Sequence, residues 1–299
     1  MGRYRHPEGA AASAAGALTA CSAGTSGVSG MIRSISSPDL ISGLDDNLVA
    51  FWSSYGRAEG CRLEASPDLV WFYTGVPHPI CNGVVRTAGT PESVLDTHAE
   101  LGRCIAAAGA PALWWVGPRS DTRLPDALAG RGLPPAGAMP GMVIDLAAIA
   151  GEPAAPSGLT IRKVDSTDLQ RLWGRICALG TNFAEPAADA FAAIEARLTD
   201  PDYRAQHRYI GLLDGQPVAS AALVTDGGVA GVYAIATIDG ARRRGIGRYM
   251  TELVLWEGRQ RGNHVGVLQA SAMGRPIYER IGFRAVCTYS FHLQDSALA

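Results

Sequence analysis

Apolar residues recur along this chain with two alternating spacings, one typical of amphipathic helices and one typical of buried strands. In the first half, apolar positions three and four apart predict a helix over residues 40–55. A second helix is predicted over residues 91–108, and both of its ends are defined. Thr90 suits the N-cap position, Pro91 suits the first turn, and Gly109 suits the residue that ends the helix. The other predicted elements of this half are a short helix over residues 124–131 and strands at 70–73, from 84, 113–116 and 142–146.

The second half repeats a similar order of elements. Ser166 is placed to cap a helix that runs to about residue 179, and Asp168 adds an acidic side chain to its first turn. Asp214-Gly215 between two apolar runs predicts a hairpin. The other predicted elements are helices over residues 186–198, 245–261 and 275–281, and strands over 159–164, 208–213, 217–224, 232–237, 264–269 and 283–292.

A chain of 299 residues is long enough for about two domains. Residues 150–158 contain two prolines, two glycines and no large apolar side chain, which predicts a linker. The predicted domains are therefore residues 31–149 and 159–299, both of mixed α/β class. Their short helices end alike, in Gly132-Leu133 and Gly282-Phe283, which indicates a weak internal duplication. The alternative is the ordinary alternation of elements in any α/β chain.

The composition, 47% hydrophobic and 18% charged, is that of folded domains with sizeable cores. A net charge of −2 argues against nucleic-acid binding and against an electrostatic membrane anchor, since both need a broad basic surface. No apolar run approaches the roughly 20 residues of a membrane-spanning helix. The six cysteines are scattered without CxxC or Cys/His groupings, which predicts reduced thiols in a cytoplasmic protein and no metal site.

Residues 1–30 are mostly Ala, Gly and Ser and predict a disordered tail. Within this tail, Arg3 and Arg5 precede a small-residue run that ends at Cys21 and resembles a lipoprotein cleavage site. The run is rich in Ala and Gly rather than Leu, which favours a coincidence. Met31 is an alternative start of the native chain. A lipid on Cys21 would contradict the cytoplasmic prediction.

The strongest chemical signal is the segment Arg242-Arg243-Arg244-Gly245-Ile246-Gly247, between a predicted strand and a predicted helix. The first turn of a helix exposes N–H groups without partners, and the helix dipole adds a partial positive charge. Glycines let a ligand approach the backbone, and guanidinium groups suit phosphate oxygens. The segment therefore predicts a seat for a phosphate or pyrophosphate. The alternative is a solvated arginine turn; a Walker lysine and the third glycine of a dinucleotide site are absent.

A second motif follows about thirty residues later, the segment Tyr278-Glu279-Arg280-Ile281-Gly282-Phe283. The succession of Arg-x-x-Gly-x-Gly, helix, strand and Tyr-x-x-x-Gly-Phe resembles the GNAT superfamily of acyl-CoA-dependent N-acetyltransferases over about residues 159–293. The resemblance implies a mixed sheet whose two central parallel strands splay apart. It also implies acetyl-CoA as the acyl donor, with its pantetheine arm in the splay.

The resemblance also assigns roles to individual residues. Backbone groups of the strand before the motif would bind the pantetheine arm and the acetyl group, and the motif itself would bind the pyrophosphate. Ser271 stands where the family usually carries an Asn that contacts the cofactor, and its side chain is shorter. The implied cofactor-binding set is Ile235, Ala236, Thr237, Arg242, Arg243, Arg244, Gly245, Ile246, Gly247, Arg248 and Ser271.

Tyr278 is the predicted general acid. Acetyl transfer expels a thiolate whose conjugate acid has a pKa of about 8.5, and a tyrosine hydroxyl with a pKa near 10 can donate a proton as the C–S bond breaks. The alternative for Tyr278 is a core position on the last helix. The identity of the general base is not predicted, because Gly266 occupies the strand position where some family members carry Glu. Glu185 and His207 are two candidates.

If the chain is duplicated, its first half is a degenerate domain that braces the active one and walls the acceptor pocket. Leu128 stands in place of the tyrosine and cannot donate a proton. The segment Arg86-x-x-Gly89 echoes the pyrophosphate motif, but Pro91 follows and lacks an N–H donor. Four tryptophans of this half are expected mainly in the core, with the pocket wall as the alternative: Trp52, Trp71, Trp114 and Trp115.

We therefore predict an acetyl-CoA-dependent N-acetyltransferase that acts on a primary amine of a small molecule or peptide. The alternative is a non-catalytic acyl-CoA-binding or sensory module, which the departures at Gly266 and Ser271 favour. A nucleotide-binding protein is a third interpretation, weakened by the absence of the Walker lysine and of metal ligands.

Overall fold

The structure is a computed structural model and describes residues 30–198 and 206–295. The predicted tail and its lipoprotein-like site at Cys21 therefore lie outside the described residues, apart from Gly30. The first half of the chain consists of α1 (Leu40–Ser53), η1 (Ser54–Arg57), β1 (Arg62–Ala65), β2 (Leu69–Tyr73), η2 (Pro79–Cys81), β3 (Asn82–Thr87), α2 (Pro91–Ala108), β4 (Ala112–Val116), α3 (Leu124–Gly130), β5 (Pro135–Asp145) and η3 (Leu146–Ala148).

The second half begins after residues 150–158, which form neither helix nor strand. It consists of β6 (Leu159–Lys163), α4 (Thr167–Gly180), α5 (Glu185–Glu195), β7 (Gln206–Leu213), β8 (Gln216–Asp226), β9 (Val229–Thr237), η5 (Asp239–Ala241), α6 (Ile246–Gln260), β10 (Val265–Gln269), α7 (Arg275–Ile281) and β11 (Arg284–Gln294). Most predicted elements are present within a few residues. Strand β1 was not predicted, and β5 starts seven residues earlier than expected.

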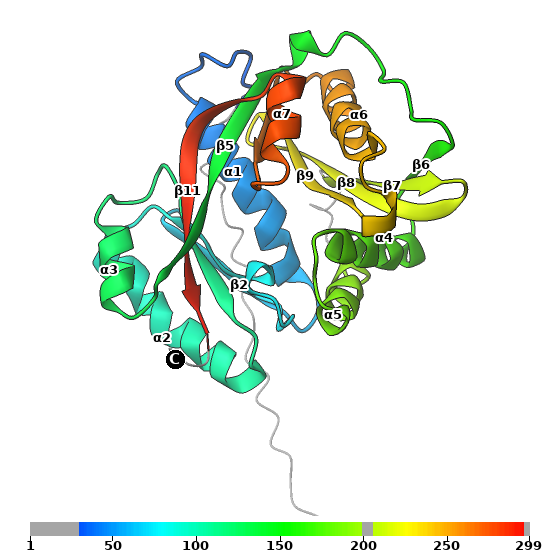
Figure 1. The fold of residues 1–299 in the computed structure, drawn as a ribbon. Helices are drawn as coiled ribbons and strands as arrows, with labels where there is room; N and C mark the ends of the chain where they lie inside the picture. The colour runs from blue at the N-terminus through cyan, green and yellow to red at the C-terminus, as the bar shows by residue number, and fades with distance from the viewer. Residues whose placement is uncertain (1–29, 199–205, 296–299) are drawn as a thin grey trace, which may run out of the picture.

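All eleven strands form one mixed sheet in the order β1-β2-β3-β4-β11-β5-β10-β9-β8-β7-β6 (Figure 1). The predicted mixed α/β class is thereby confirmed. The last strands of the two halves are exchanged: β11 pairs with β4 of the first half, and β5 pairs with β10 of the second. The two exchanged strands also pair with each other, and they run side by side through the molecule in Figure 1. Each half of the sheet is therefore completed by a strand of the other.

The two halves repeat one arrangement, as the internal duplication predicts. In each, a helix connects two parallel strands: α2 leads from β3 to β4, and α6 leads from β9 to β10. In each, a short helix and a long antiparallel strand follow, α3 with β5 and α7 with β11. Parallel neighbours need such crossover connections, whereas antiparallel neighbours do not. A crossover alone is therefore common to α/β chains, and the repetition lies in the full order of crossover helix, parallel strand, short helix and long antiparallel strand.

Side chains of β2 alternate between the two faces of the sheet, and each face carries its own core. Val70 and Phe72 point into a central core that α1, α4 and α5 share, whereas Trp71 and Tyr73 point into a core under α2 and α3. A third core lies under α6. Among the described helices, none has both the length and the apolar character to span a bilayer.

Helix α1 belongs to the first half but also binds the second. Asn47 is fully buried, and its Nδ2 donates hydrogen bonds to the carbonyls of Val224 (3.0 Å) and Asp226 (2.7 Å) at the end of β8. Gly231 must lack a side chain there, because a Cβ would lie 1.8 Å from Asn47 Oδ1. Each buried hydrogen bond contributes about 1 kcal/mol and fixes the position of the helix.

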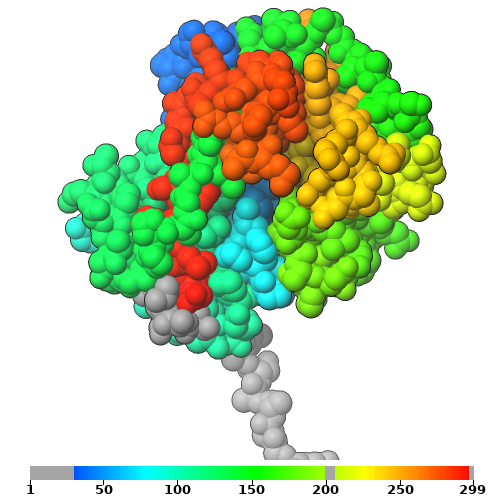
Figure 2. Space-filling model, viewed as in Figure 1, coloured from blue at the N-terminus to red at the C-terminus, as the bar shows by residue number. Residues whose placement is uncertain are grey.

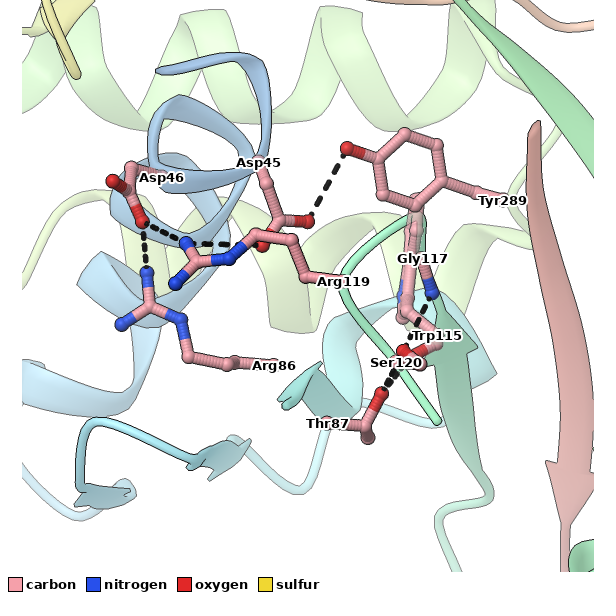
Figure 3. A network of polar contacts seen from close by, with 9 residues as sticks. All are labelled: Asp45, Asp46, Arg86, Thr87, Trp115, Gly117, Arg119, Ser120 and Tyr289. Atoms are coloured by element: carbon pink, nitrogen blue, oxygen red, sulfur yellow. Dashed lines mark hydrogen bonds and ion pairs between the residues drawn. The ribbon is translucent and has the colours of Figure 1, made fainter. Parts of the chain in front are cut away.

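The other side of α1 is tied to the first half by charged groups (Figure 3). Asp46 accepts hydrogen bonds from Arg86 and from Arg119 (2.9 Å). Asp45 is buried, accepts a hydrogen bond from Tyr289 Oη (3.3 Å) and lies 3.7 Å from Arg119. Burial raises the pKa of Asp45 to about 6, although both arginines act to lower it. The network joins α1, β3, the loop after β4 and the exchanged strand β11.

This pKa predicts a pH-dependent contribution to stability. Between pH 3.8 and about 6 the folded chain binds the Asp45 proton that the unfolded chain releases, so the contribution of Asp45 falls as the pH rises. Replacing Asp45 with Asn removes this titration. Relative to the parent, Asp45→Asn should gain up to about 3 kcal/mol in unfolding free energy between pH 4 and pH 7. Urea unfolding at several pH values measures the difference.

Asp39→Asn is the matched control, because Asp39 is exposed at the start of the same helix. Its unfolding free energy should differ from that of the parent by less than about 0.5 kcal/mol, because the Asp39 side chain is exposed and makes no cap hydrogen bond. A difference for Asp45→Asn that stays constant with pH would contradict the raised pKa.

Candidate functional site

Strands β9 and β10 separate at the centre of the sheet. Their parallel pairing ends at Gly231 and Val267, after two residue pairs. Just beyond, β9 contains a bulge at Ala234, whose φ of 52° is left-handed. Ser220 Oγ donates a hydrogen bond to the Ala234 carbonyl (2.9 Å) and holds the bulge in place. The predicted splay of two central parallel strands is confirmed, and past it one edge of β9 has no β10 partner.

A cavity of about 990 Å³ occupies this splay. Figure 2 shows the molecule hollowed where the orange C-terminal segment, the gold α6 and the green α4–α5 region meet the cyan part of the first half. Arg244 is exposed and does not line the cavity. The predicted site residues that do line it are Ile235, Ala236, Thr237, Arg242, Arg243, Gly245, Ile246, Gly247, Arg248, Ser271 and Tyr278.

The turn before α6 fits an extended anionic group. Gly245 caps the helix in the left-handed conformation (φ 77°), and Arg243 is also left-handed (φ 64°). A Cβ on Gly247 would meet only Thr237 Oγ1 at 3.9 Å, so the helix start is open to a ligand. The first turn of α6 carries no acidic side chain. Open N–H groups at the positive end of a 15-residue helix suit a diphosphate.

Arg242 is held inside the protein instead of pointing freely at a ligand. Its Nε donates to the Thr237 carbonyl (3.0 Å), its Nη2 donates to the Gly180 carbonyl (3.0 Å), and its Nη1 pairs with Asp239 (2.8 Å). The guanidinium thereby ties the end of α4 to the end of β9 and to the turn before α6. Its main contribution is to position the turn, whereas Arg243 and Arg248 are exposed beside it.

Tyr278 lies on α7 at the same cavity. Its ring packs edge-on against Phe283, with centroids 5.8 Å apart. Gly274 lies against the ring, since a Cβ there would be 2.7 Å from Tyr278 Cε2. Burial raises the pKa of Tyr278 to about 12, so the phenol keeps its proton at neutral pH. Ser271 precedes α7, and its Oγ accepts a hydrogen bond from the Gly274 N–H (3.1 Å), which fixes the start of α7.

Neither proposed base reaches the cavity. Glu185 is exposed and bound to Arg175 (2.6 Å). His207 lies near Lys163, Glu257 and Arg261, at the end of α6 opposite the glycine turn. Gly266, the family's Glu position, is buried against α6 and β5. A Cβ there would meet Leu255 at 2.6 Å and Ile144 at 2.9 Å, so no side chain fits.

The structure instead brings His78 to the cavity, from the first half of the chain. Its ring stacks on Phe183 of the loop after α4, with centroids 3.8 Å apart, and its Nδ1 accepts a weak hydrogen bond from the Ile80 N–H (3.4 Å). Burial lowers the pKa of His78, which keeps the imidazole neutral at pH 7. A lone histidine in a loop carries no local sequence signal, and sequence reasoning missed it.

The tryptophans of the first half divide between the two expected roles. Trp71 and Trp114 are fully buried core residues, whereas Trp52 and Trp115 line the cavity. The degenerate motif of this half is not a binding site, because Arg86 is engaged by Asp46. Leu128, at the position that corresponds to Tyr278, is completely buried in the core under α2 and α3.

Comparison with known proteins identifies this arrangement. Residues 176–283 match the model of the acetyltransferase (GNAT) family. A GCN5-related N-acetyltransferase from Kribbella flavida is 19% identical, with a TM-score of 0.59 over 84% of this chain and 95% of that chain. A tandem GNAT protein from the clavulanic acid biosynthesis pathway is 14% identical, with a TM-score of 0.54 over 83% and 87%.

A conserved protein of unknown function from Staphylococcus epidermidis is 14% identical, with a TM-score of 0.55 over 80% and 94% of the two chains. No curated protein sequence matches this chain. At these identities the solved structures show a shared fold, and the family match is confined to residues 176–283.

The contact between Gly274 and Tyr278 predicts the effect of one added methyl group. In Gly274→Ala the new Cβ must displace the Tyr278 ring, because the Cβ would lie well inside van der Waals distance of Cε2. We expect thiol release from acetyl-CoA to slow roughly 10- to 100-fold, as for other small misplacements of reacting groups. Coenzyme A affinity, measured by calorimetry, should change by less than about threefold.

Gly240→Ala serves as the control, since a Cβ at Gly240 meets nothing within 4 Å and the site is two residues before the motif. Its turnover should equal that of the parent. Equal turnover of Gly274→Ala and the parent would show that the position of the Tyr278 ring does not limit turnover.

Proposed function

We propose, from the premise that residues 176–283 form a domain of the GNAT acetyltransferase family, that this protein transfers the acetyl group of acetyl-CoA to a primary amine. The observation that carries the proposal is a single cavity that contains an unpaired strand edge, an open helix start and a protonated phenol. These three features correspond to the three parts of the donor: pantetheine arm, diphosphate and sulfur. A binding module without chemistry would not need the third.

The donor would lie along β9. Beyond Gly231 the free edge of residues 232–237 offers backbone groups to the amides of the pantetheine arm. The diphosphate would bind the N–H groups that begin α6, with Arg243 and Arg248 close by. Arg280 of α7 also lines the cavity and adds a cation that sequence reasoning did not assign.

The reaction would use one residue from each half of the chain. The amine nitrogen attacks the thioester carbonyl carbon, and the C–S bond breaks as the amide C–N bond forms. His78 accepts the proton that the nitrogen loses, and Tyr278 donates a hydrogen bond and then its proton to the departing sulfur. The raised pKa of Tyr278 keeps this proton in place until charge develops on the sulfur.

Tyr278→Phe tests the acid. The variant keeps the ring and its contact with Phe283 but lacks the hydroxyl, so we expect thiol release to fall on the order of 10²-fold. Coenzyme A should bind with nearly parental affinity in calorimetry. Tyr249→Phe is the matched control, because Tyr249 is a buried residue of α6 outside the cavity lining.

Three results would count against the proposal. No heat of binding with coenzyme A would remove the donor altogether. Binding without thiol release on any amine would favour the non-catalytic acyl-CoA module. Parental turnover in Tyr278→Phe would leave acetyl transfer standing but would eliminate the phenol as the acid.

His78→Gln tests the base through the pH dependence of turnover. The imidazole accepts a proton only above its pKa, and burial lowers that pKa, so turnover of the parent should fall along an acidic limb whose midpoint lies below the ordinary histidine value of 6.5. The variant should be slower at pH 7 and should lack this acidic limb. His207→Gln is the control and should keep the limb, since His207 lies away from the cavity. An acidic limb that persists in His78→Gln would assign it to another group.

A further inference from the structure

The cavity has two chemically different ends. The end at residues 234–237 of β9 and the start of α6 is lined by backbone groups and arginines. The opposite end, here termed the acceptor end, consists mainly of side chains from the first half of the chain. It comprises Phe51, Trp52, Trp115, Met139, Phe191 and Tyr233.

The aromatic rings of the acceptor end support one another and are largely removed from solvent. Phe51 stacks on Tyr233 with centroids 4.3 Å apart, and Phe51 packs edge-on against Trp52 at 4.9 Å. Trp52 lies 6.2 Å from Trp115, and Trp115 is 4% exposed. Rings held by such contacts form a rigid apolar wall in which Trp52 lies at 68° to Phe51 and at 43° to Trp115. An aromatic molecule gains from such a wall, because face and edge contacts with its rings add to the burial of its surface.

The acceptor end offers no countercharge to an ammonium group. In the described part of the chain, no Asp or Glu lines the cavity, and its charged lining residues are the arginines Arg242, Arg243, Arg248 and Arg280. Asp45 acts electrostatically on Tyr233, but it lies behind the wall and is engaged by Arg119 and Tyr289. An ammonium group buried here without a carboxylate partner would lose its hydration, and a cation–π contact with the rings would return only part of that loss.

Two buried polar atoms at this end lack hydrogen-bond partners among the described residues, Tyr233 Oη and Gln269 Nε2. Gln269 interacts weakly with the Tyr233 hydroxyl, but the contact lies outside normal hydrogen-bond geometry. Buried polar groups are normally satisfied, so these atoms point to a neutral polar group of a bound molecule. His78, the titratable base of the lining, is uncharged as well, because burial lowers its pKa.

We propose that the acceptor is an aromatic amine whose nitrogen is conjugated with the ring and therefore uncharged at neutral pH. This inference rests on the proposed function and deepens it. The ring would lie on the aromatic wall, and its nitrogen would face the sulfur end of the donor. The neutral nitrogen attacks the thioester carbon, its proton passes to His78, and the products are an N-aryl acetamide and coenzyme A with a free thiol.

Two isomeric probes separate shape from charge: 4-methylaniline, which is uncharged at pH 7.5, and benzylamine, which is an ammonium ion. Both carry one ring and the same atoms. With acetyl-CoA, we expect kcat/KM for 4-methylaniline to exceed that for benzylamine at least tenfold, measured as thiol release. With coenzyme A in place of the donor, 4-methylaniline should quench the fluorescence of Trp52 and Trp115 at concentrations at which benzylamine does not.

Met139→Glu and Met139→Gln form the matched pair of variants. Met139 is half-buried on β5 at the acceptor end, and the two replacements differ in charge but hardly in size. The carboxylate should shift the kcat/KM ratio toward benzylamine at least tenfold, whereas the amide should not. Coenzyme A affinity, which depends on the other end of the cavity, shows whether each variant has folded.

The outcomes separate the two levels of the proposal. Faster transfer to benzylamine than to 4-methylaniline would overturn the acceptor class while acetyl transfer stands. Absence of coenzyme A binding would overturn the proposed function, and the quenching assay without cofactor would still test the acceptor end. The inference would be overturned if 4-methylaniline showed neither thiol release nor fluorescence quenching. It would also be overturned if Met139→Glu and Met139→Gln changed the kcat/KM ratio of the two amines equally.

Discussion

The exchange of β5 and β11 is the constraint on which the rest of this structure depends. Each strand follows a short helix of its own half and then pairs with the central strand of the other half. Neither half can therefore complete its sheet alone, because each would leave an unpaired edge in the middle of the molecule. The pairing of β5 with β11 makes the two half-sheets continuous. The cavity beside β10 consequently has walls from both halves.

Helix α1 uses this continuity to connect the halves a second time. Asn47 binds the end of β8, whereas Asp45 and Asp46 bind arginines of the first half. Phe51, one turn later on the same helix, stacks on Tyr233 of the splayed strand. A helix fixed at three places positions the aromatic wall with little freedom, which a selective acceptor site needs.

The first half of the chain lacks the donor-binding groups of the second half but supplies side chains to its cavity. Its counterpart of the pyrophosphate motif contains Arg86, and the carboxylate of Asp46 occupies that guanidinium. Its counterpart of the tyrosine is a buried leucine, Leu128. This half instead supplies Trp52, His78 and Trp115 to the cavity of the other half. The two halves thus divide the proposed reaction, with the donor on one side and the acceptor on the other.

The sequence alone determined the features that are encoded within short segments. Thr90, Pro91 and Gly109 bound α2 as predicted, and the glycines of the second half define the turn before α6. The order of the two motifs predicted the splay and the resemblance that the match of residues 176–283 supports, since strand, glycine turn and helix are contiguous in the chain. The predicted residues around this turn, except Arg244, line one cavity.

The tertiary structure decided everything that depends on pairing between distant segments. Residues 135–141 contain two prolines and little apolar alternation, so only their pairing with β11 makes them part of β5. Gly266 is closed to a side chain because Ile144 of the exchanged strand packs over it. His78 reaches the cavity only because the first half folds against the second. Local propensity and motif spacing act over a few residues, whereas the contacts that build the acceptor end join residues as distant in sequence as Phe51 and Tyr233.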